Sequence, residues 1–298
     1  MKSSNARTDR DILTKHAYAN DEHLSLRYRI HDEYSRPKID FQSWVVEAFD
    51  WRGDERVLDV GAGSGSYFEP VQARIPQGVH VAGDLSFGMA QQAHQRAADL
   101  RTEVLNLDVQ RLPFADDSFD VVLANHMLYH VPDLDAALLD IRRVLREDGC
   151  LIAATNSATN MPELDTLYRR AITLLGFPKH RFSIFQSNFT LESGPRRLAH
   201  FFRAVARYDL PSALYFPEVE PVLAYIDSMR DIREPQLPDE ITWDDFMEMM
   251  EKQISRLIRH MGELQVNKLS GVLIATNGGG FAHDYLHLLD EAALSEAG

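Results

Sequence analysis

The sequence predicts an α/β fold: a doubly wound, mostly parallel seven-stranded sheet with a helical cap over its carboxyl edge. Short apolar runs alternate with amphipathic segments from residue 55 to residue 155, a pattern typical of repeated strand–helix units. A glycine-rich turn follows directly on the first of these runs, as in sheets that bind a ligand beyond their first strand. The alternation stops after residue 155, and the helical segments that replace it predict the cap.

The composition is acidic and that of an ordinary globular protein. The 298 residues include 31 Lys and Arg against 45 Asp and Glu, a formal net charge of −14, so we expect no nucleic-acid partner. Cys150 is the only cysteine, which excludes an internal disulfide and a CxxC metal site. No apolar run approaches the roughly 18 residues of a membrane-spanning helix, and none follows the polar N-terminus. We therefore expect a cytoplasmic protein that does not insert into a membrane.

Two helices are expected before the sheet. Residues 18–35 are rich in His, Tyr and Arg, and Pro37 is expected to end that helix or to force a turn. Residues 41–49 form the second helix, because apolar side chains recur there at spacings of three and four. Such a stripe is typical of a helix that packs on a core.

Five buried strands are expected in the region of alternation, and each ends at a polar or glycine position. The expected strands are 57–60, 79–83, 104–107, 119–124 and 150–155. The expected connecting helices include 67–74, 89–100 and 134–145, and Asp148-Gly149 is expected to stop the last of these. Right-handed crossovers would place such helices on the two faces of a parallel sheet.

The residues after 155 are expected to complete the sheet and to supply the cap. Two later strands, near 201–210 and 269–276, bring the total to seven, and the helix at 242–264 has Thr242 at its N-cap position. The predicted organisation is an N-terminal helical segment that covers the ligand site (1–50), a ligand-binding core (51–155), cap insertions (156–200 and 217–265), the last core strands (201–216 and 266–280) and a tail (281–298).

The turn after the first strand has glycine at alternate positions. Gly61, Gly63 and Gly65 leave no Cβ between the backbone and a ligand, and Asp59 precedes them on the strand. A dinucleotide-binding turn has the spacing G-x-G-x-x-G, whereas here the third glycine comes one residue early and Ser66 takes its place. This spacing argues against a nicotinamide or flavin cofactor, although a nucleotide-like ligand is still indicated.

Polar side chains end the next three strands. Asp84 is placed to accept both hydroxyls of a ribose diol, and Asp108 to accept from an exocyclic amine such as adenine N6. Asn125 offers a donor and an acceptor to an amino-acid-like group. Any one of these residues alone could be an ordinary strand-end turn residue. Their occurrence at successive strand ends favours a ligand with an adenosine part and an amino-acid part.

The order of these motifs resembles that of class I S-adenosylmethionine-dependent methyltransferases. The closest resemblance is to the type 11 small-molecule branch, which includes ubiquinone-biosynthesis enzymes. The motifs that carry it lie between about residues 55 and 155: Asp59-Val-Gly-Ala-Gly-Ser-Gly65, Asp84-Leu-Ser86 with Met89, Asp108-Val-Gln-Arg-Leu-Pro-Phe114, Phe119-Asp-Val-Val-Leu-Ala-Asn125-His-Met-Leu-Tyr-His130 and Arg143-Val-Leu-Arg-Glu-Asp-Gly149. The resemblance implies a Rossmann-like methyltransferase fold, S-adenosyl-L-methionine as cofactor and S-adenosyl-L-homocysteine as product.

The resemblance also implies a role for each site residue. The three glycines would pass under the amino-acid portion of the cofactor, with Asp59 near its ammonium. Asp84 would hold the ribose. The adenine would be flanked by Leu85 and Met89 and addressed at its edge by Asp108 and Val109. Asn125 and His126 would close the sulfonium side. Ser35 would join the site from the N-terminal segment, which tends to fold over the cofactor in such proteins.

Methyl transfer from a sulfonium is an in-line displacement, and a neutral OH or NH acceptor must also lose a proton. The candidate bases are His126, His31 and Tyr34, with His130 as a weaker candidate that could simply shape the following turn. Each histidine could instead be a hydrogen-bonded structural residue. No metal is expected, because His283 and His287 have i, i+4 spacing without an accompanying carboxylate or cysteine cluster.

The favoured function is therefore methyl transfer to a small-molecule acceptor. A catalytically silent scaffold or sensor that binds S-adenosylmethionine is the alternative. A nucleic-acid or protein methyltransferase is less favoured: nucleic-acid amino-methyltransferases carry an Asn/Asp-Pro-Pro-aromatic motif after the fourth strand, and Asn125-His126-Met127-Leu128 lacks both prolines. The sequence carries no signal for the identity of the acceptor or for the oligomeric state.

Overall fold

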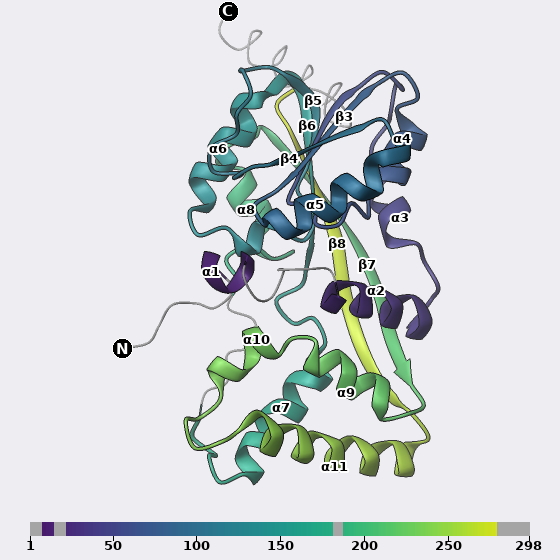
Figure 1. Ribbon diagram of the computed structural model, residues 1–298, viewed down its shortest axis with the longest axis vertical. Coiled ribbons are helices and arrows are strands. Elements are labelled where there is room, and N and C mark those ends of the chain that lie inside the picture. Colours follow the sequence, from purple (N-terminus) through teal and green to yellow (C-terminus); the bar gives the residue numbers. More distant parts are fainter. Residues whose placement is uncertain (1–7, 15–21, 181–186, 279–298) are drawn as a thin grey trace, which may run out of the picture. The chain divides into compact units, whose positions relative to one another are not determined.

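The computed structural model describes residues 8–14, 22–180 and 187–278 of the chain. The chain divides into two compact units, each assembled from three segments (Figure 1). Unit 1 comprises Met1–Asp40, Ser157–Ser187 and Leu210–Ser270, and unit 2 comprises Phe41–Asn156, Asn188–Asp209 and Gly271–Gly298. The domain boundaries and the placement of the cap remain predictions.

The sheet confirms the predicted α/β class. Its strand order is β1-β7-β8-β6-β5-β2-β3-β4, so it has eight strands where seven were expected. The additional strand is β1 (Ser35–Arg36), a two-residue strand antiparallel to β7. The other strands are β2 (Arg56–Val60), β3 (Val79–Asp84), β4 (Thr102–Asn106), β5 (Phe119–Leu123), β6 (Leu145–Asn156), β7 (Ala204–Phe216) and β8 (Leu264–Thr276).

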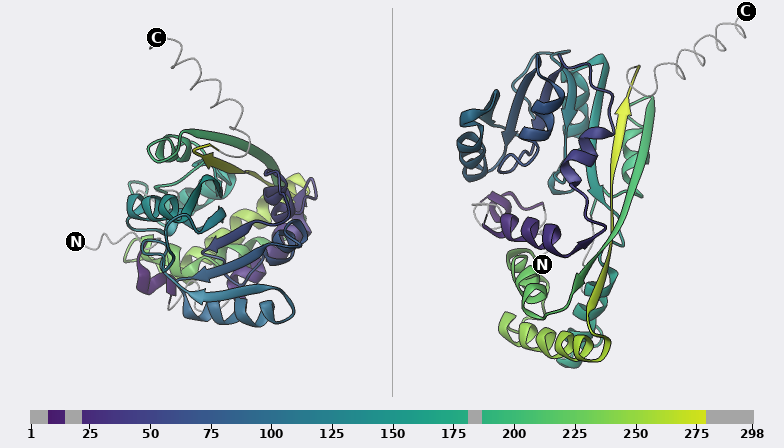
Figure 2. Two further views of the ribbon diagram at one scale, coloured as in Figure 1. Left: turned by 90° about the horizontal axis from the view of Figure 1, so that it is seen from above. Right: turned by 90° about the vertical axis from the view of Figure 1, so that its right-hand side faces the viewer.

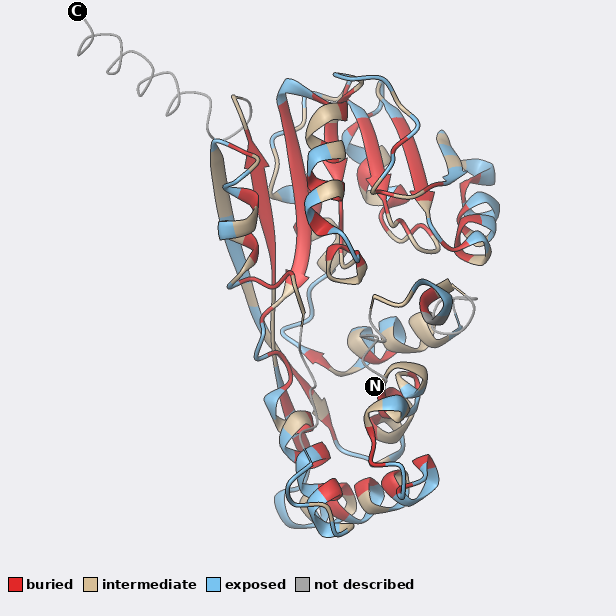
Figure 3. Cartoon of the chain, turned by 90° about the vertical axis from the view of Figure 1, so that its left-hand side faces the viewer, coloured by how far each residue is buried: buried red, intermediate tan, exposed pale blue. Residues whose placement is uncertain are grey.

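Five strands of unit 2 pair in parallel, and four of them are largely buried. In the order of the sheet, the five strands are β4, β3, β2, β5 and β6. Buried residues run along β3, β2, β5 and β6, whereas the edge strand β4 has only half-buried and exposed residues (Figure 3). In β2, the side chains of Val57, Leu58 and Val60 are fully buried, which is typical of a strand with both faces covered. The helices of this unit are α3 (Phe41–Glu47), α4 (Phe68–Arg74), α5 (Phe87–Arg96), α6 (Leu134–Val144) and α8 (Gly194–Leu198), with 3-10 turns η2 (Ala97–Asp99) and η3 (Leu128–His130).

The predicted stop of the helix before the fifth strand is wrong. Helix α6 ends at Val144, and β6 begins at Leu145, so Asp148 and Gly149 lie inside a strand. Leu145 pairs with Phe119, whereas Cys150 pairs with Val121, so residues 146–149 form an irregularity in the ladder. A Cβ on Gly149 would lie 3.0 Å from the carbonyl oxygens of Arg146 and Asp120, which explains the glycine by close backbone approach.

Strands β7 and β8 are longer than expected and run in opposite directions (Figures 1 and 2). The predicted end of β7 at Leu210 is wrong because the strand continues through Pro211. A proline is tolerated in a strand where its neighbour does not require a hydrogen-bond donor. On the β1 side, β7 is paired only at Ala213 and Leu214, so Pro211 lies beyond that pairing.

Unit 1 is mainly helical. Its helices are α1 (Arg10–Ile12), α2 (Glu22–Tyr34), α7 (Pro162–Leu174), α9 (Glu220–Asp227), α10 (Arg230–Arg233) and α11 (Trp243–Met261), with the 3-10 turn η4 (Glu234–Gln236). Thr242 caps α11 as predicted: its hydroxyl accepts from the backbone N–H of Asp245, whose carboxylate accepts from the Thr242 N–H. The hydrophobic core of this unit includes Tyr168, Phe216 and Phe246.

The described helices include none that is long and apolar enough to span a membrane. The expected helix at 18–35 is observed from Glu22 to Tyr34, and its first residues lie outside the described ranges.

Candidate functional site

The glycine turn after β2 needs glycine for both conformation and space. Gly61, Gly63 and Gly65 have φ values of 68°, 56° and 85°, which lie in the left-handed region that side chains disfavour. A Cβ on Gly61 would lie 2.7 Å from the Cβ of Met127, and one on Gly65 would lie 2.5 Å from the ring of Phe68. The backbone of the turn therefore has no room for larger residues at these two positions.

Asp84, the last residue of β3, holds the glycine turn in place. Its Oδ2 accepts a hydrogen bond from Gly63 N–H at 2.9 Å, and its Oδ1 accepts from Ser86 N–H at 2.8 Å. Burial raises the pKa of Asp84, and the backbone N–H groups of Ser86, Gly63 and Leu85 oppose that rise. A carboxylate has about four acceptor positions, so both oxygens retain lone pairs for a ribose diol.

Asp59 is a buried carboxyl group with an unsatisfied oxygen. The residue is 1% exposed, and Oδ2 has no hydrogen-bond partner in the described part of the chain. Burial, followed by the charge of Asp84, raises the pKa of Asp59 to about 8. A buried polar atom without a partner is costly, and a cationic group would supply the missing interaction. Asp59 therefore fits the ammonium of an amino-acid-like ligand.

Side-chain amides fix the end of β4 and the residues that follow it. Asn106 Nδ2 donates to the carbonyl oxygens of Asp84 and Leu85 at 2.8 and 3.0 Å, which ties the end of β4 to that of β3. Asp108 Oδ1 accepts from the backbone N–H of Gln110 at 3.0 Å and from Gln110 Nε2 at 3.2 Å. These contacts fix the orientation of the Asp108 carboxylate.

Asn125 follows β5 and presents a buried donor. Its Oδ1 accepts from Ala154 N–H at 3.0 Å, so the acceptor half of the amide is engaged by β6. Its Nδ2 is buried and has no hydrogen-bond partner among the described residues. Of the two functions expected of this side chain, the donor is therefore the one that is not already engaged by the described residues.

His126 has an unusual backbone conformation for a non-glycine residue, with φ of 54°. Its N–H donates to Ala154 O at 2.8 Å, which stabilises the turn after β5. The imidazole lies 5.3 Å from the ring of Phe41 and 6.4 Å from that of Tyr129, measured between ring centroids. Strained backbone of this kind is often found at functional sites, and it sets the direction of the ring here.

The predicted adenine-binding residues differ in burial. Leu85 is 37% exposed beyond β3, whereas Val109 is buried and Met89 is 1% exposed in the first turn of α5. Ser86 caps α5 by accepting from Met89 N–H at 3.3 Å. Their contacts with an adenine remain predictions.

His31, Tyr34 and Ser35 belong to unit 1, so their predicted roles at the cofactor site remain predictions. Lys268 Nζ lies 2.9 Å from His31 Nδ1 and donates to Ser35 Oγ at 2.9 Å. Tyr34 packs on the ring of Phe216 at a centroid distance of 5.0 Å.

The structure adds three residues that the motifs did not single out for a role: Ser86, Asn106 and Lys268. Ser86 had a signal, because a serine directly before a helix is a common N-cap. Asn106 and Lys268 had none, since their partners come from distant parts of the chain.

His130 closes a turn through its N–H, which donates to Met127 O at 2.8 Å. The described residues contain no group of three or more His, Cys, Asp or Glu that could hold a metal ion. His283 and His287 lie outside the described ranges.

Comparison with known proteins identifies the region that carries this site. Residues 58–153 match the type 11 methyltransferase family, described as "Methyltransferase domain". A malonyl-[acyl-carrier protein] O-methyltransferase of Legionella pneumophila is 32% identical over 117 residues, which cover 39% of this chain and 41% of the relative. The enzyme of the same name from Geobacter sulfurreducens is 32% identical over 176 residues, covering 56% and 63%. The chain thus spans less than two thirds of the length of either relative.

A solved structure supports the fold. Phosphoethanolamine N-methyltransferase 2 of Haemonchus contortus, in complex with phosphomonomethylethanolamine and S-adenosylhomocysteine, has a TM-score of 0.53 and 16% sequence identity. The match covers 90% of this chain and 60% of that chain, and at this identity it bears on the fold alone. The family match therefore identifies residues 58–153 as a region similar to the type 11 methyltransferase domain.

Proposed function

We propose that this protein transfers a methyl group from S-adenosylmethionine to a small-molecule acceptor. The observation that carries the proposal is the buried carboxyl oxygen of Asp59, which has no hydrogen-bond partner among the described residues. Asp59 lies near the end of β2, and β2 leads into the glycine turn that Asp84 holds in place. This arrangement offers a negative group for an ammonium next to acceptors for a ribose. The two relatives named above are methyltransferases, which supports the same reaction class.

Different residues of unit 2 bind different parts of the methyl donor. The glycine turn accommodates the amino-acid portion, with Asp59 at the ammonium, and Asp84 accepts from the ribose hydroxyls. Asp108 and Val109 contact the edge of the adenine, and Asn125 Nδ2 donates to the amino-acid portion. S-adenosylmethionine supplies an activated methyl group on a sulfonium.

The protein contributes chiefly positioning to such a displacement. Alignment of acceptor, methyl group and leaving atom contributes about 7–11 kcal/mol in well-oriented systems. His126 is the proposed general base, because the Ala154 hydrogen bond and the Phe41 ring hold its backbone and imidazole next to Asn125. It would accept the proton that an OH or NH acceptor loses, an effect worth about 10²–10⁴-fold in rate.

The proposed acceptor is a small molecule and not a nucleic acid, since the net charge of −14 opposes binding to a polyanion. We also propose a cytoplasmic location and no membrane insertion. The buried free thiol of Cys150, in a chain with no second cysteine, is consistent with a reducing compartment.

Two measurements test the proposal in sequence. Isothermal titration with S-adenosylhomocysteine is expected to show one binding site, and its absence would overturn the proposal. Transfer of a labelled methyl group from S-adenosylmethionine is then measured on a panel of small acids, alcohols, amines and phenols. Binding together with transfer supports the enzyme, whereas binding without transfer to any acceptor favours the silent scaffold or sensor.

A further inference from the structure

Gln110 is a half-buried residue of unit 2 whose side chain contacts two separate parts of that unit. Its Nε2 donates to Asp108 Oδ1 at 3.2 Å and to Asp108 Oδ2 at 3.4 Å, in the turn that follows β4. Its Oε1 accepts from the backbone N–H of Asp133 at 3.0 Å, directly before α6. The donor end of the amide therefore contacts a carboxylate, and the acceptor end contacts the start of a helix.

The donor end restricts the Asp108 carboxylate together with the backbone. Asp108 Oδ1 also accepts from the backbone N–H of Gln110 at 3.0 Å, and the carbonyl oxygen of Asp108 accepts from Arg111 N–H at 2.9 Å. An aspartate that accepts from the backbone two residues later forms a local turn. The side-chain amide adds a second donor to the same carboxylate, so rotation of that group is restricted from two directions.

The acceptor end ties Gln110 to a firmly packed helix. Asp133 is the N-cap residue of α6, and its Oδ1 accepts from the backbone N–H of Ala136 at 3.0 Å. The helix packs on the core of the unit through side chains such as Leu138, which is fully buried. Through Gln110, the orientation of the Asp108 carboxylate is thus set by the start of α6 as well as by its own turn.

The orientation of a carboxylate decides which purine it can bind. A carboxylate accepts hydrogen bonds and cannot donate them. A 6-amino purine offers an N–H at position 6, whereas a 6-oxo purine offers an acceptor there and carries its N–H one ring atom away, at N1. A carboxylate that turns freely can accept from either group. One that is held in a single direction accepts from one of them and rejects the analogue that lacks it.

We propose that Gln110 is a positioning residue that makes the cofactor site selective for a 6-amino purine, because it holds the Asp108 carboxylate in one orientation. The inference rests on the proposed function, in which Asp108 contacts the edge of the adenine. Gln110 acts through Asp108 and not on the purine itself. Its loss should therefore change the ratio of two affinities, for the 6-amino and the 6-oxo ligand.

Calorimetric titration of the full-length protein measures this ratio. The ligands are S-adenosylhomocysteine and S-inosylhomocysteine, in which a 6-oxo group replaces the 6-amino group. Wild type is expected to prefer the adenosyl compound by about tenfold to hundredfold, the effect of one hydrogen bond to a charged group. Gln110→Glu keeps an acceptor for the Asp133 N–H, removes the donor to Asp108 and adds a like charge beside it. This variant should lose about tenfold of the preference.

A second variant and a matched control exclude a general disturbance of the fold. Gln110→Met removes both contacts without adding a charge, so it should also lose the preference. In the ligand-free protein it should speed hydrogen exchange of the Asp133 amide, which Gln110→Glu should leave protected. Gln95→Glu makes the same substitution at an exposed position of α5 and should change neither quantity. Loss of the preference in Gln110→Met alone would show that the contact with α6 decides and would overturn the inference.

The outcomes separate this inference from the proposed function. Failure of the wild-type protein to bind S-adenosylhomocysteine would overturn the proposed function. Binding by wild type with equal affinity for the two ligands would overturn the inference alone, as would a preference that both Gln110 variants retain. A fall in both affinities by the same factor in Gln110→Glu would show a merely structural role and would also overturn it.

Discussion

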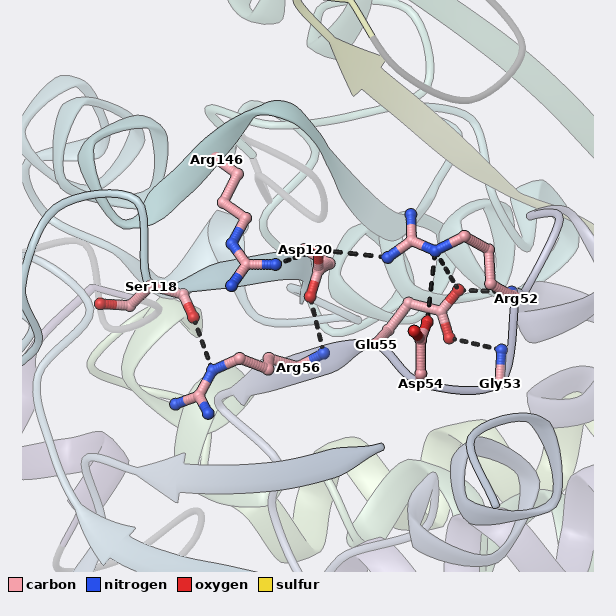
Figure 4. A network of polar contacts seen from close by, with 8 residues as sticks. All are labelled: Arg52, Gly53, Asp54, Glu55, Arg56, Ser118, Asp120 and Arg146. Atoms are coloured by element: carbon pink, nitrogen blue, oxygen red, sulfur yellow. Dashed lines mark hydrogen bonds and ion pairs between the residues drawn. The ribbon is translucent and has the colours of Figure 1, made fainter. Parts of the chain in front are cut away.

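The two edges of the parallel strands in unit 2 differ in how their carboxylates are compensated. At the amino edge, Asp120 accepts from Arg146 at 2.7 Å, from the Arg56 N–H at 2.8 Å and from Arg52 at 3.3 Å (Figure 4). At the carboxyl edge, Asp59 has an oxygen with no hydrogen-bond partner among the described residues, and Asp84 accepts from backbone N–H groups. The cations are therefore concentrated where the carboxylates serve the fold.

The pKa shifts follow this difference. Burial tends to raise the pKa of Asp120, but the hydrogen bonds from Arg56, Arg146 and Arg52 outweigh it and hold the value below the ordinary range. At Asp59 burial is almost complete and unopposed, and together with the charge of Asp84 it raises the pKa to about 8. A carboxyl group that the fold leaves uncompensated is thus a better indicator of a ligand site than burial alone.

The largest effect is expected for His126→Ala at the carboxyl edge. Turnover should fall about 10²–10⁴-fold if the imidazole accepts the acceptor's proton, while affinity for S-adenosylhomocysteine stays within a factor of two to three. Single-turnover kinetics and calorimetry measure the two quantities. His94→Ala, at an exposed position on α5, is the control. Unchanged turnover with the native acceptor would remove His126 as a base.

Asp84→Ala is expected to weaken S-adenosylhomocysteine binding by about a hundredfold or more. The variant loses the ribose acceptors, and hydrogen bonds to a charged group are worth about 1.5–3 kcal/mol each. It also loses the contact with Gly63, so a thermal unfolding curve should accompany the titration, and Asp84→Asn provides a milder variant. Asp120→Asn, at the opposite edge, should bind normally. Equal weakening in both variants would contradict the division between the edges.

Asp120→Asn should lower the free energy of unfolding by about 2 kcal/mol, because it loses partly buried charge-assisted hydrogen bonds. Since the folded-state pKa is depressed, this stabilisation is present above the unfolded pKa of about 4 and is lost as the pH falls further. Urea unfolding at pH 7 and at pH 3 measures it. Glu47→Gln, which removes an exposed ion pair with Arg74, should cost less than about 1 kcal/mol.

The smallest expected effect is the pH dependence of ligand binding that Asp59 causes. With a pKa of about 8, this residue is mostly protonated at pH 6–7 and must ionise to bind an ammonium. Affinity for S-adenosylhomocysteine should therefore rise about tenfold from pH 6 to pH 7, and the proton released on binding should make the measured binding enthalpy vary with the ionisation enthalpy of the buffer. In Asp59→Asn this dependence should disappear. The same pH slope in the variant would refute the assignment.

The free energy of unfolding should change with pH in the opposite direction to the ligand affinity, again because of Asp59. A raised folded-state pKa means that the stabilisation is complete below pH 4 and is lost as the pH rises through about 8. Asp59→Asn should thus become more stable than wild type toward pH 8.5 when no ligand is bound.

The sequence was sufficient for the parts of the molecule that depend on local chemistry. Alternating glycines predicted a turn after the first strand, where the structure has backbone in the left-handed region, and Asp59 and Asp84 were expected on either side of it. The sequence was insufficient for features that depend on contacts between segments far apart in the chain. The irregular β6 pairing depends on the approach of Gly149 to Asp120, and the passage of β7 through Pro211 depends on a two-residue neighbour. The Lys268 contacts join residues more than 230 positions apart.

The late position of β8 in the chain has a consequence for synthesis on the ribosome. Val272 and Ile274 of this strand belong to the same hydrophobic core as Val45 and Val57, near the start of unit 2. The early strands therefore emerge long before their last packing partners exist, although domains commonly fold as they are made. A nascent chain stalled before Val272 would present an incomplete core to the cell, and chaperone binding is expected to concentrate on that interval.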